Sequence, residues 1–476
     1  MADCDAIVIG GGLAGLACAI ALADGGIRVT VLEREQELGG RARSLTDPAT
    51  GDRLDLGPHI LLSEYRNLLA LLDMLGTRDR IAWQGRRFIT LVDAPCAMTL
   101  HVYPLPPPLH FLPDLLRVPQ LSLADVASNA RLLWRVLRLD QARRLALDAV
   151  DAETCLRDLG VSERFLDWYW RTVSMAIMNV PLQDCSAGAL FGFFRYMVGR
   201  GGYQVGLPTV GLGDLFAREA RERIEAVGGR VLPGVQAERL SPDPGGGPCG
   251  VVLVDGTELR ARHVVAALPP PSLLALLPEA LRGIPVFRDL PAFAPSPYVS
   301  TYLWFDRKLT RERFWAKVWS PDALHYDFYD LSNLRAGWST RGSVIACNLI
   351  HSDRAAHLDD ARIIEAARRE IGAYLPQALR ADVRHAAVHR IPMAIPAPHP
   401  GSERLRPGPR APVPGLYLAG DWTATGLPAS MESATRSGWL AAEQVLADSG
   451  RPHAWARPLP RMQGLAALVG GRAPAA

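Results

Sequence analysis

Asp5-Ala6-Ile7-Val8-Ile9-Gly10-Gly11-Gly12-Leu13-Ala14-Gly15 is the stretch that decides the fold of this 476-residue chain. Its first five residues form a short apolar run with β-branched side chains, which is typical of a buried strand. The Ala- and Leu-rich residues 16–24 predict a helix, and residues 28–32 predict a second strand that ends on Glu33. A glycine motif between strand and helix, followed by an acidic residue, indicates a Rossmann-like α/β fold that binds a dinucleotide.

Each residue type of the motif has a physical role. Gly10 allows a sharp turn off the strand, Gly12 lets a pyrophosphate approach the backbone, and Gly15 lets the helix pack against the strands. Leu13 and Ala14 open the helix, whose free N–H groups and dipole attract phosphate. A glycine-rich turn in some other α/β protein is the alternative, and the complete strand–motif–helix–acid pattern argues against it.

The acidic residue at the end of the second strand selects the dinucleotide. The Glu33 carboxylate can accept hydrogen bonds from a ribose 2′-hydroxyl, whereas it would repel a 2′-phosphate. NADP is therefore not expected in this site. The adjacent Arg34 is a further candidate contact for the cofactor.

Length, charge and cysteine content narrow the class of protein. A chain of 476 residues exceeds one ordinary core and predicts two domains, and a net charge of +3 indicates no nucleic-acid partner. The seven cysteines are scattered without a C-x-x-C pair, which predicts reduced thiols in a cytoplasmic protein and no metal site. No apolar run is long enough for a transmembrane helix, and the first strand begins too early for a secretory signal.

The residues after Glu33 carry a first family resemblance. Glu37-Leu38-Gly39-Gly40-Arg41-Ala42-Arg43 resembles the second glycine pair of the amine-oxidase and phytoene-desaturase flavoprotein superfamily, which implies that the cofactor is FAD. By that resemblance Gly39 and Gly40 approach the cofactor closely, Arg41 meets the pyrophosphate, and Arg43 is the second phosphate candidate. A surface turn with two solvated arginines is the alternative for this stretch taken alone.

A second stretch corresponds to the flavin-facing segment of that superfamily. In Asp55-Leu56-Gly57-Pro58-His59 the resemblance implies that Gly57 lets the backbone approach the isoalloxazine ring and that Pro58 stiffens it. His59 is a tentative catalytic residue that could donate a hydrogen bond or proton to the ring or substrate. A histidine among apolar residues is also often only structural.

The order of these segments predicts an FAD-binding domain interleaved with a mixed α+β substrate domain. In the second cofactor segment the family resemblance places Val235 near the adenine. The expected parts are FAD-binding residues 1–76, 205–270 and 406–450, substrate-domain residues 77–204 and 271–405, and a flexible tail at 451–476.

Residues 103–121 are apolar and too rich in proline for a helix interior or a central strand. Ser122 and Asp125 then form a predicted capping box, and the helix that follows places apolar residues from Leu123 to Leu137 on one face and arginines off it. An apolar loop before a basic amphipathic helix would suit peripheral contact with the cytoplasmic membrane face. Packing on the protein's own core is the alternative.

The segment near the end of the chain, Gly420-Asp421 through Ala434, is a strand end followed by a helix start. In flavoproteins of this type the aspartate, here Asp421, holds the ribitol. Pro428 suits a first helical turn. The resemblance also implies that Met431 and Glu432 lie at the pyrimidine edge of the flavin, where a helix dipole stabilises negative charge.

The stretch 420–429 is very similar to the hydroxysqualene dehydroxylase family, also called squalene-associated FAD-dependent desaturases. The same family resembles this chain at 59–62, 121–123, 179–181 and 187–190. The implied function is reductive dehydroxylation of hydroxysqualene to squalene in hopanoid or triterpene biosynthesis. Hydride would pass from reduced FAD to an allylic carbon of this long apolar isoprenoid, and an unidentified external donor would supply electrons.

Three alternatives stay open from the sequence. Asp55-Leu56-Gly57-Pro58 is closer to carotenoid desaturases than to the dehydroxylases, which favours an isoprenoid desaturase running the hydride onto FAD. An amine oxidase is disfavoured, because neither Lys308 nor Lys317 has an evident flavin-adjacent context. A non-catalytic prenyl-binding module, such as the GDP-dissociation inhibitors that share the fold, is disfavoured by the intact glycine motif.

Overall fold

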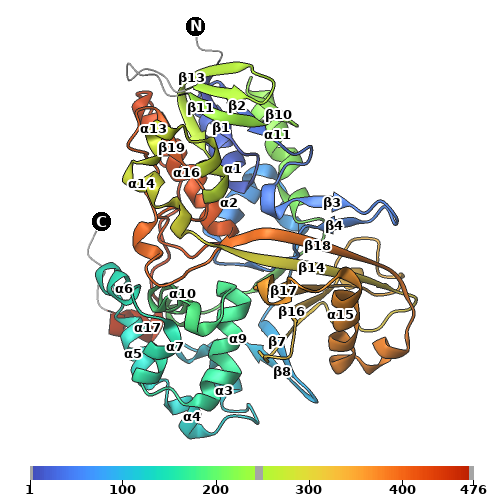
Figure 1. Ribbon diagram of the computed structural model, residues 1–476. Coiled ribbons are helices and arrows are strands. Elements are labelled where there is room, and N and C mark those ends of the chain that lie inside the picture. Colours follow the sequence, from blue (N-terminus) through green and yellow to red (C-terminus); the bar gives the residue numbers. More distant parts are fainter. Residues whose placement is uncertain (1–3, 242–249, 471–476) are drawn as a thin grey trace.

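The computed structural model describes residues 4–241 and 250–470. Figure 1 shows a domain with a parallel sheet above a second domain that combines a mixed sheet with a group of helices. The chain crosses between the two domains several times, so each is built from separate stretches of sequence. This arrangement confirms the expected α/β fold class with an interleaved mixed domain.

The upper domain is organised around five parallel strands. In spatial order they are β10 (Arg230–Pro233), β2 (Val29–Glu33), β1 (Cys4–Ile9), β13 (Glu258–Ala266) and β19 (Leu416–Leu418). Val8 of β1 lies between Val31 and Val265, and these three side chains belong to the core on one face of the sheet. Ile7 and Val264 belong to the core on the other face, so both faces are apolar. The first half of β13 also pairs antiparallel with β12 (Gly250–Leu253), which pairs in turn with β11 (Ala237–Ser241).

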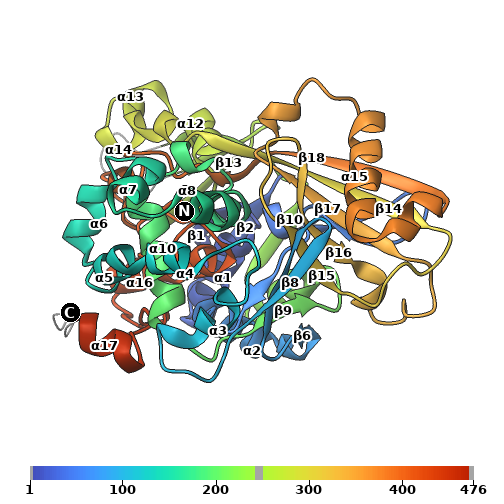
Figure 2. The ribbon, with the colours of Figure 1, turned by 90° about the horizontal axis from the view of Figure 1, so that it is seen from below.

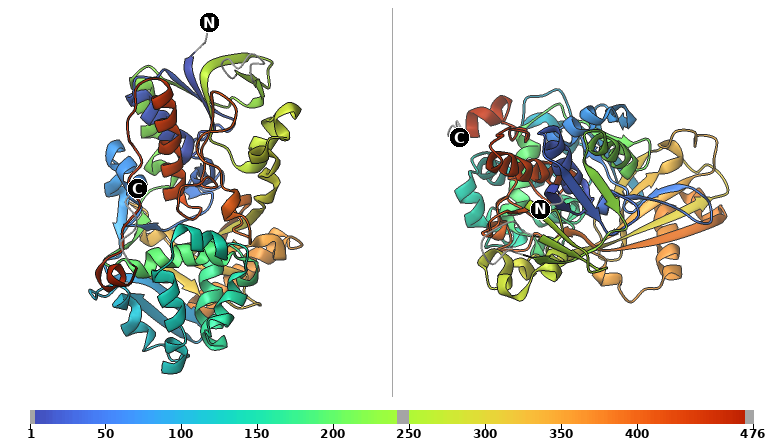
Figure 3. Two further views of the ribbon diagram at one scale, coloured as in Figure 1. Left: turned by 90° about the vertical axis from the view of Figure 1, so that its left-hand side faces the viewer. Right: turned by 90° about the horizontal axis from the view of Figure 1, so that it is seen from above.

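Two helices pack closely beside the central strands because glycines face the contact. Helix α1 (Leu13–Asp24) follows the glycine motif, and α16 (Met431–Asp448) runs next to it, as Figure 3 shows. A Cβ on Gly15 would lie 1.9 Å from the Gly10 carbonyl oxygen, and one on Gly438 would lie 2.1 Å from the Ala14 carbonyl oxygen. Only glycine fits at either position.

The lower domain contains a seven-stranded mixed sheet. Its order is β18 (Val383–Pro396), β14 (Pro295–Phe305), β17 (Val344–Ile350), β16 (His325–Asp330), β15 (Phe314–Lys317), β7 (Arg87–Asp93) and β8 (Cys96–His101). Helix α15 (Asp360–Tyr374) covers one face, where Ile371 packs with Leu303 and Phe328 (Figure 2). The opposite face, here called the inner face, packs against residues 54–60 of the cofactor domain.

Strand β18 runs through a stretch that is rich in proline. Pro392 lies inside the strand, which continues to Pro396. Proline is tolerated there because β18 is the edge strand, and its pairing with β14 shifts register around Pro392.

The helical part of the lower domain also differs from its expected form. Ser122 and Asp125 form the predicted capping box, but the following stripe is broken into α4 (Leu123–Ala127) and α5 (Ala130–Leu137). Asn129 Nδ2 donates to the Asp125 carbonyl oxygen at 3.2 Å, which competes with helix continuation. As a result Leu123 and Trp134 are exposed rather than part of one buried face.

The stretch after Arg451, expected as a flexible tail, is packed against the fold as far as residue 470. Trp455 and Ala456 donate their backbone N–H groups to Glu443 Oε1, and Gln463 donates to the Gly199 carbonyl oxygen. The described chain ends in α17 (Gly464–Gly470), which contacts α5 and α10 (Ala187–Gly199). Side chains of this stretch also pack on the fold, since Trp455 contacts Trp439 and Ala466 joins the core of the helical part. Composition alone does not reveal these contacts, because their partners are distant in the sequence.

Replacing Gly438 tests the close approach of α1 and α16. Gly438→Ala should lower the free energy of unfolding by about 1–3 kcal/mol through overpacking, measured by chemical denaturation. Gly283→Ala is the matched control, because a Cβ there meets nothing within 4 Å, and it should cause little change. Equal stability of the two variants would contradict this packing.

Candidate functional site

The N-terminus of α1 is open toward the place where a pyrophosphate would lie. Gly10 has φ +109, and a Cβ there would approach the Ala267 carbonyl oxygen at 2.6 Å, so the sharp turn requires glycine. Gly12 is the N-cap residue, and no side chain of the described residues caps it. A Cβ on Gly12 would meet only the Gly40 backbone, at 3.7 Å or more. Leu13 and Ala14 thus begin a helix whose first N–H groups suit an anion.

Glu33 ends β2 beside this turn and is almost fully buried. Its Oε2 accepts a hydrogen bond from the Gly11 N–H at 2.7 Å, and its Oε1 accepts from the Glu35 N–H at 2.9 Å. A carboxylate has further lone pairs available, so a ribose hydroxyl can still be accepted. Val235 N–H donates to the Glu33 carbonyl oxygen at 2.9 Å, which places the adenine-side candidate next to the acid. Arg34 is mostly exposed and pairs with Glu35.

The second glycine pair lies directly over the first glycine motif. Gly39 N–H donates to the Gly11 carbonyl oxygen at 2.8 Å, and a Cβ on Gly40 would lie 3.0 Å from Gly12 Cα. Both glycines have positive φ. The structure therefore brings two segments that the sequence separates by some thirty residues into one backbone-lined cradle.

The two charged candidates of this region contact each other. Arg41 Nη2 lies 2.6 Å from Asp421 Oδ1, and Arg41 Nη1 donates to the Ala394 carbonyl oxygen at 2.7 Å. Asp421 is buried and Arg41 is one-third exposed. Arg43 instead donates to the Gly40 carbonyl oxygen at 3.3 Å and lies 4.0 Å from Glu35. The pair joins the phosphate side of the expected cofactor path to its ribitol side.

The loop between β19 and α16 holds the remaining cofactor candidates. Gly420 N–H donates to Ser437 Oγ at 2.8 Å, which fixes the start of the loop against α16. Met431 is the first residue of α16, so its backbone lies at the helix N-terminus, whereas Pro428, predicted in the first helical turn, lies in the loop before the N-cap residue Ser430. Glu432 departs from its expected role. Its carboxylate accepts from the Asn67 and Leu68 N–H groups and caps α2 (Arg66–Leu75), and burial raises its pKa.

Arg406 is a residue of this loop region that sequence reasoning missed. Its guanidinium donates to the carbonyl oxygens of Asp421 at 2.5 Å, Thr423 at 3.0 Å and Leu427 at 2.8 Å. It also pairs with Glu403 at 3.0 Å, and both side chains are buried. No sequence motif identifies an arginine that donates hydrogen bonds to the backbone carbonyls of a loop about fifteen residues away. Arg406 therefore fixes the conformation that presents Asp421.

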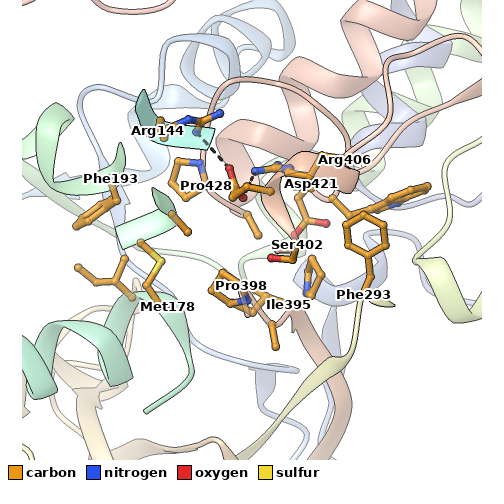
Figure 4. A pocket seen from close by; sticks show the side chains of 17 residues that line it. Arg144, Met178, Phe193, Phe293, Ile395, Pro398, Ser402, Arg406, Asp421 and Pro428 are labelled. Carbon is orange, nitrogen blue, oxygen red and sulfur yellow. Dashed lines mark hydrogen bonds and ion pairs between the residues drawn. The ribbon is translucent and has the colours of Figure 1, made fainter. Parts of the chain in front are cut away.

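A pocket lies beside this loop, between the two domains (Figure 4). Arg144, Glu403 and Arg406 form its charged side, and Asp421 and Pro428 lie at its end toward the cofactor loop. The remaining lining is largely apolar and comprises Ile177, Met178, Ala189, Phe193, Phe293, Ile395, Pro396, Ala397, Pro398, Trp422 and Ala429, with Ser402. Its free volume is about 30 Å³. A long ligand therefore requires these side chains to move apart.

The expected flavin-facing segment crosses the inner face of the mixed sheet. A Cβ on Gly57 would lie 3.3 Å from Ile391 Cδ1 and 3.4 Å from Tyr298 Cε1, so the backbone lies against the sheet. Pro58 is buried. His59 keeps exposed surface although protein surrounds its ring and lowers its pKa by burial. A ring that is surrounded by protein and still has accessible surface lines an internal space, and the lowered pKa keeps it neutral near pH 7.

Asp55 holds this segment in place. The sequence identified Asp55 only as part of the motif and did not predict this role. Its Oδ2 lies 2.5 Å from Arg335 Nη2, and its Oδ1 accepts from Ser44 Oγ and the Leu212 N–H. The Asp55 carbonyl oxygen accepts from Tyr302 OH at 2.5 Å. Asp55 is thus a positioning residue that ties the cofactor domain to the inner face of the sheet.

These residues together fit an FAD. A buried acid beside the first strand suits the ribose, and the uncapped N-terminus of α1 with its cradle of glycine backbone suits the pyrophosphate. Arg41 supplies a cation and Asp421 an acceptor for hydroxyl groups. Within residues 4–241 and 250–470, no three His, Cys, Asp or Glu side chains group as metal ligands would, and no helix combines the length and apolar character that crossing a bilayer needs.

Known proteins are similar to this chain over most of its length. A family model described as "Flavin containing amine oxidoreductase" matches residues 13–446. The 15-cis-phytoene desaturase of Solanum lycopersicum is 27% identical over 93% of this chain and 77% of that protein. The 15-cis-phytoene desaturase of Synechococcus elongatus is 27% identical over 94% and 98%. The hydroxysqualene dehydroxylase of Rhodopseudomonas palustris is 28% identical over 92% and 98%.

Solved structures of amine oxidases share the fold. A putrescine oxidase double mutant matches with a TM-score of 0.71 and 15% identity, over 93% of this chain and 99% of that one. Cyclohexylamine oxidase from Brevibacterium oxydans matches with a TM-score of 0.68 and 19% identity, over 94% and 100%. At such identities the likeness establishes the fold alone.

Arg406→Met tests the assignment of the loop. Removing the guanidinium frees three carbonyls, and because one charged hydrogen bond contributes about 1.5–3 kcal/mol, FAD affinity should fall at least about tenfold. Arg404→Met, at an exposed position on the same turn, should bind FAD normally. The measurement is the dissociation constant of FAD for each deflavinated protein. Unchanged affinity in Arg406→Met would remove Arg406 from the site.

Proposed function

We propose that this chain, which belongs to the flavin-containing amine oxidoreductases and uses FAD, oxidises a long apolar polyisoprenoid by desaturation. Bound FAD supplies the acceptor for a hydride, and the protein supplies position, a dry surrounding and proton transfer. The observation that carries the proposal is the apolar pocket that ends at Asp421 and Pro428, beside the loop expected to hold the flavin.

The chemistry of the pocket supports an apolar substrate over an amine. Its lining offers side chains of Ile, Met, Phe, Pro and Trp, and each buried methylene of a ligand gains about 0.8 kcal/mol. Its charged residues are already paired with one another, as Figure 4 shows, and so do not supply a free anchor for an ammonium group. The phytoene desaturases among the relatives act, by name, on such a hydrocarbon.

Reductive dehydroxylation of hydroxysqualene, the main expectation from the sequence, is the second candidate. The relative named hydroxysqualene dehydroxylase matches over nearly its whole length. The phytoene desaturases match as widely at nearly the same identity, and Asp55-Leu56-Gly57-Pro58 is closer to their pattern. The comparisons therefore favour desaturation.

Product analysis under anaerobic conditions separates the two reactions. The oxidised holoenzyme with phytoene and a quinone acceptor should yield a desaturated product with more double bonds, detected by mass spectrometry. The reduced holoenzyme with hydroxysqualene should yield no squalene. Squalene in the second incubation without product in the first would establish the dehydroxylase instead, and purified protein without flavin absorbance would exclude both.

We also propose that the helical region contacts a membrane, from which such a substrate would come. Exposed large apolar side chains gather on neighbouring elements of this region, some of them within the predicted segment 103–121; they are Leu105, Leu109, Leu116, Leu123, Trp134, Leu465 and Leu468. Arg138 lies over the Trp134 ring, and Arg117 is also exposed. Apolar groups beside arginines suit an anionic lipid surface.

Vesicle flotation tests the membrane contact. The double variant Leu123→Glu/Leu468→Glu should lose most binding to anionic vesicles, because both side chains are largely exposed at 72% and 80% and would carry charge into the lipid. Val254→Glu, at an exposed apolar position in the cofactor domain, is the control and should bind normally. Equal flotation of all three proteins, or none by the wild type, would contradict the contact.

A further inference from the structure

Asp327 is an unusual carboxylate on the inner face of the mixed sheet. It lies on β16, opposite Asn348 of β17 and Ala316 of β15. Its Oδ2 accepts hydrogen bonds from Asn348 Nδ2 and Tyr329 OH, both at 2.8 Å. Its Oδ1 is buried, and no donor of the described residues reaches it. A buried carboxylate oxygen without a partner costs stability, so a reason for its presence is needed.

Asp327 is connected to the segment expected to pass beside the flavin. Asn348 Nδ2 also donates to the Pro58 carbonyl oxygen at 3.4 Å, and its Oδ1 accepts from Ser300 Oγ at 3.1 Å. A Cβ on Gly57 would lie 3.6 Å from that same Ser300 Oγ. One amide side chain thus separates Asp327 from the Gly57-Pro58 backbone.

The strand that carries Asp327 packs against an element that lines the apolar pocket. β16 packs against the short helix η5 (Ser174–Met178), whose Ile177 and Met178 line that pocket. Tyr298 packs with Met175 of η5 on the same inner face. Asp327 therefore lies between the flavin-facing segment and the wall of the proposed substrate site.

Among the described residues, no cation pairs with this carboxylate. The titratable groups that interact with it electrostatically are Tyr329 on its own strand, Tyr298 on β14 and Cys347 on the neighbouring strand, and His59 lies on the segment that crosses the inner face. The tyrosines and the cysteine have pKa values raised by burial, and the pKa of His59 is lowered, so all are neutral near pH 7. Lys317 follows the paired Ala316 and lies on the opposite face. Burial accordingly raises the pKa of Asp327 to about 6.

We propose that Asp327 is the proton-transfer group of this enzyme, with Asn348 holding it in place between the flavin-facing segment and the pocket. This inference rests on the proposed function. In desaturation, one C–H bond of the substrate breaks with its electron pair passing to oxidised FAD as hydride. The C–H bond of the adjacent carbon breaks with its proton passing to Asp327 Oδ1, and its electron pair forms the new double bond.

The direction of catalysis fixes the pH dependence. A proton acceptor must be ionised, so the desaturation rate should rise with pH through about 6 and then level off. A dehydroxylase would instead need protonated Asp327 to convert the leaving hydroxide into water, and its rate should fall over the same range. The sign of the pH profile therefore reports which proton transfer occurs.

Asp327→Asn in the full-length holoenzyme is the main test. The variant should retain FAD, because Asp327 does not contact the proposed cofactor residues, but the rate of flavin reduction by phytoene should fall about 100-fold or more. Its remaining rate should lose the dependence on pH near 6. Asp327→Glu should restore part of the rate, since it returns an ionisable group.

Thermal stability gives a readout independent of turnover. The raised pKa in the folded state means that the wild type loses stability as pH rises from about 4 to about 6 and no more above that. The melting temperature of Asp327→Asn minus that of the wild type should therefore increase between pH 4.5 and 6.5 and stay constant above. A stability difference that is the same at every pH would show that the pKa of Asp327 is not raised in the folded protein, and would contradict its use as a proton acceptor near pH 6.

Tyr329→Phe keeps the proposal testable if Asp327→Asn fails to fold. Removing the Tyr329 hydroxyl takes away a donor to the ionised carboxylate, so the midpoint of the pH–rate profile should move to higher pH. An unmoved midpoint, or an Asp327→Asn rate within threefold of the wild type with an unchanged profile, would overturn the inference. An inactive wild type would overturn the proposed function itself.

Discussion

The structure depends on how closely one helix approaches its neighbours. Helix α1 lies so near to β1 and α16 that a methyl group on Gly15 or Gly438 would overlap a backbone carbonyl oxygen. This contact aims the uncapped N-terminus of α1 at the cradle formed with Gly39 and Gly40. Because the strands and α16 come from opposite ends of the chain, the cofactor cradle exists only when both ends have folded together.

The ion pair of Arg41 and Asp421 also joins segments that are far apart in the sequence. The two residues are 380 positions apart, and the buried Asp421 would be costly without a partner. Arg406 holds the loop of Asp421 through its carbonyls, and Asp55 holds the segment of Gly57 through Arg335 and Tyr302. The proposed reaction on an apolar substrate thus takes place between two backbone segments that are held by these contacts. Among the described residues next to these two segments, Asp327 is the carboxylate with a buried oxygen that has no hydrogen-bond partner.

Most of the cofactor domain could be predicted from the sequence, because its signals are local. The strand–glycine–helix unit and the strand before Gly420 both depend on neighbouring residues, as does the capping box of Ser122 and Asp125 in the other domain. The failures involve contacts between distant residues. Glu432 caps α2 instead of facing the flavin, and Arg406, Asn348 and Asp327 acquire roles only through the fold.

The central claim is that segments distant in the sequence together bind one dinucleotide, and that tight binding requires both halves of that dinucleotide. Calorimetric titration of the deflavinated protein with FAD, FMN and ADP tests this claim most directly. We predict that FAD binds at least about 100-fold more tightly than either half, because we assign Glu33 and the α1 N-terminus to one half and the Asp421 loop to the other. FMN binding as tightly as FAD, or no binding of FAD, would contradict the account.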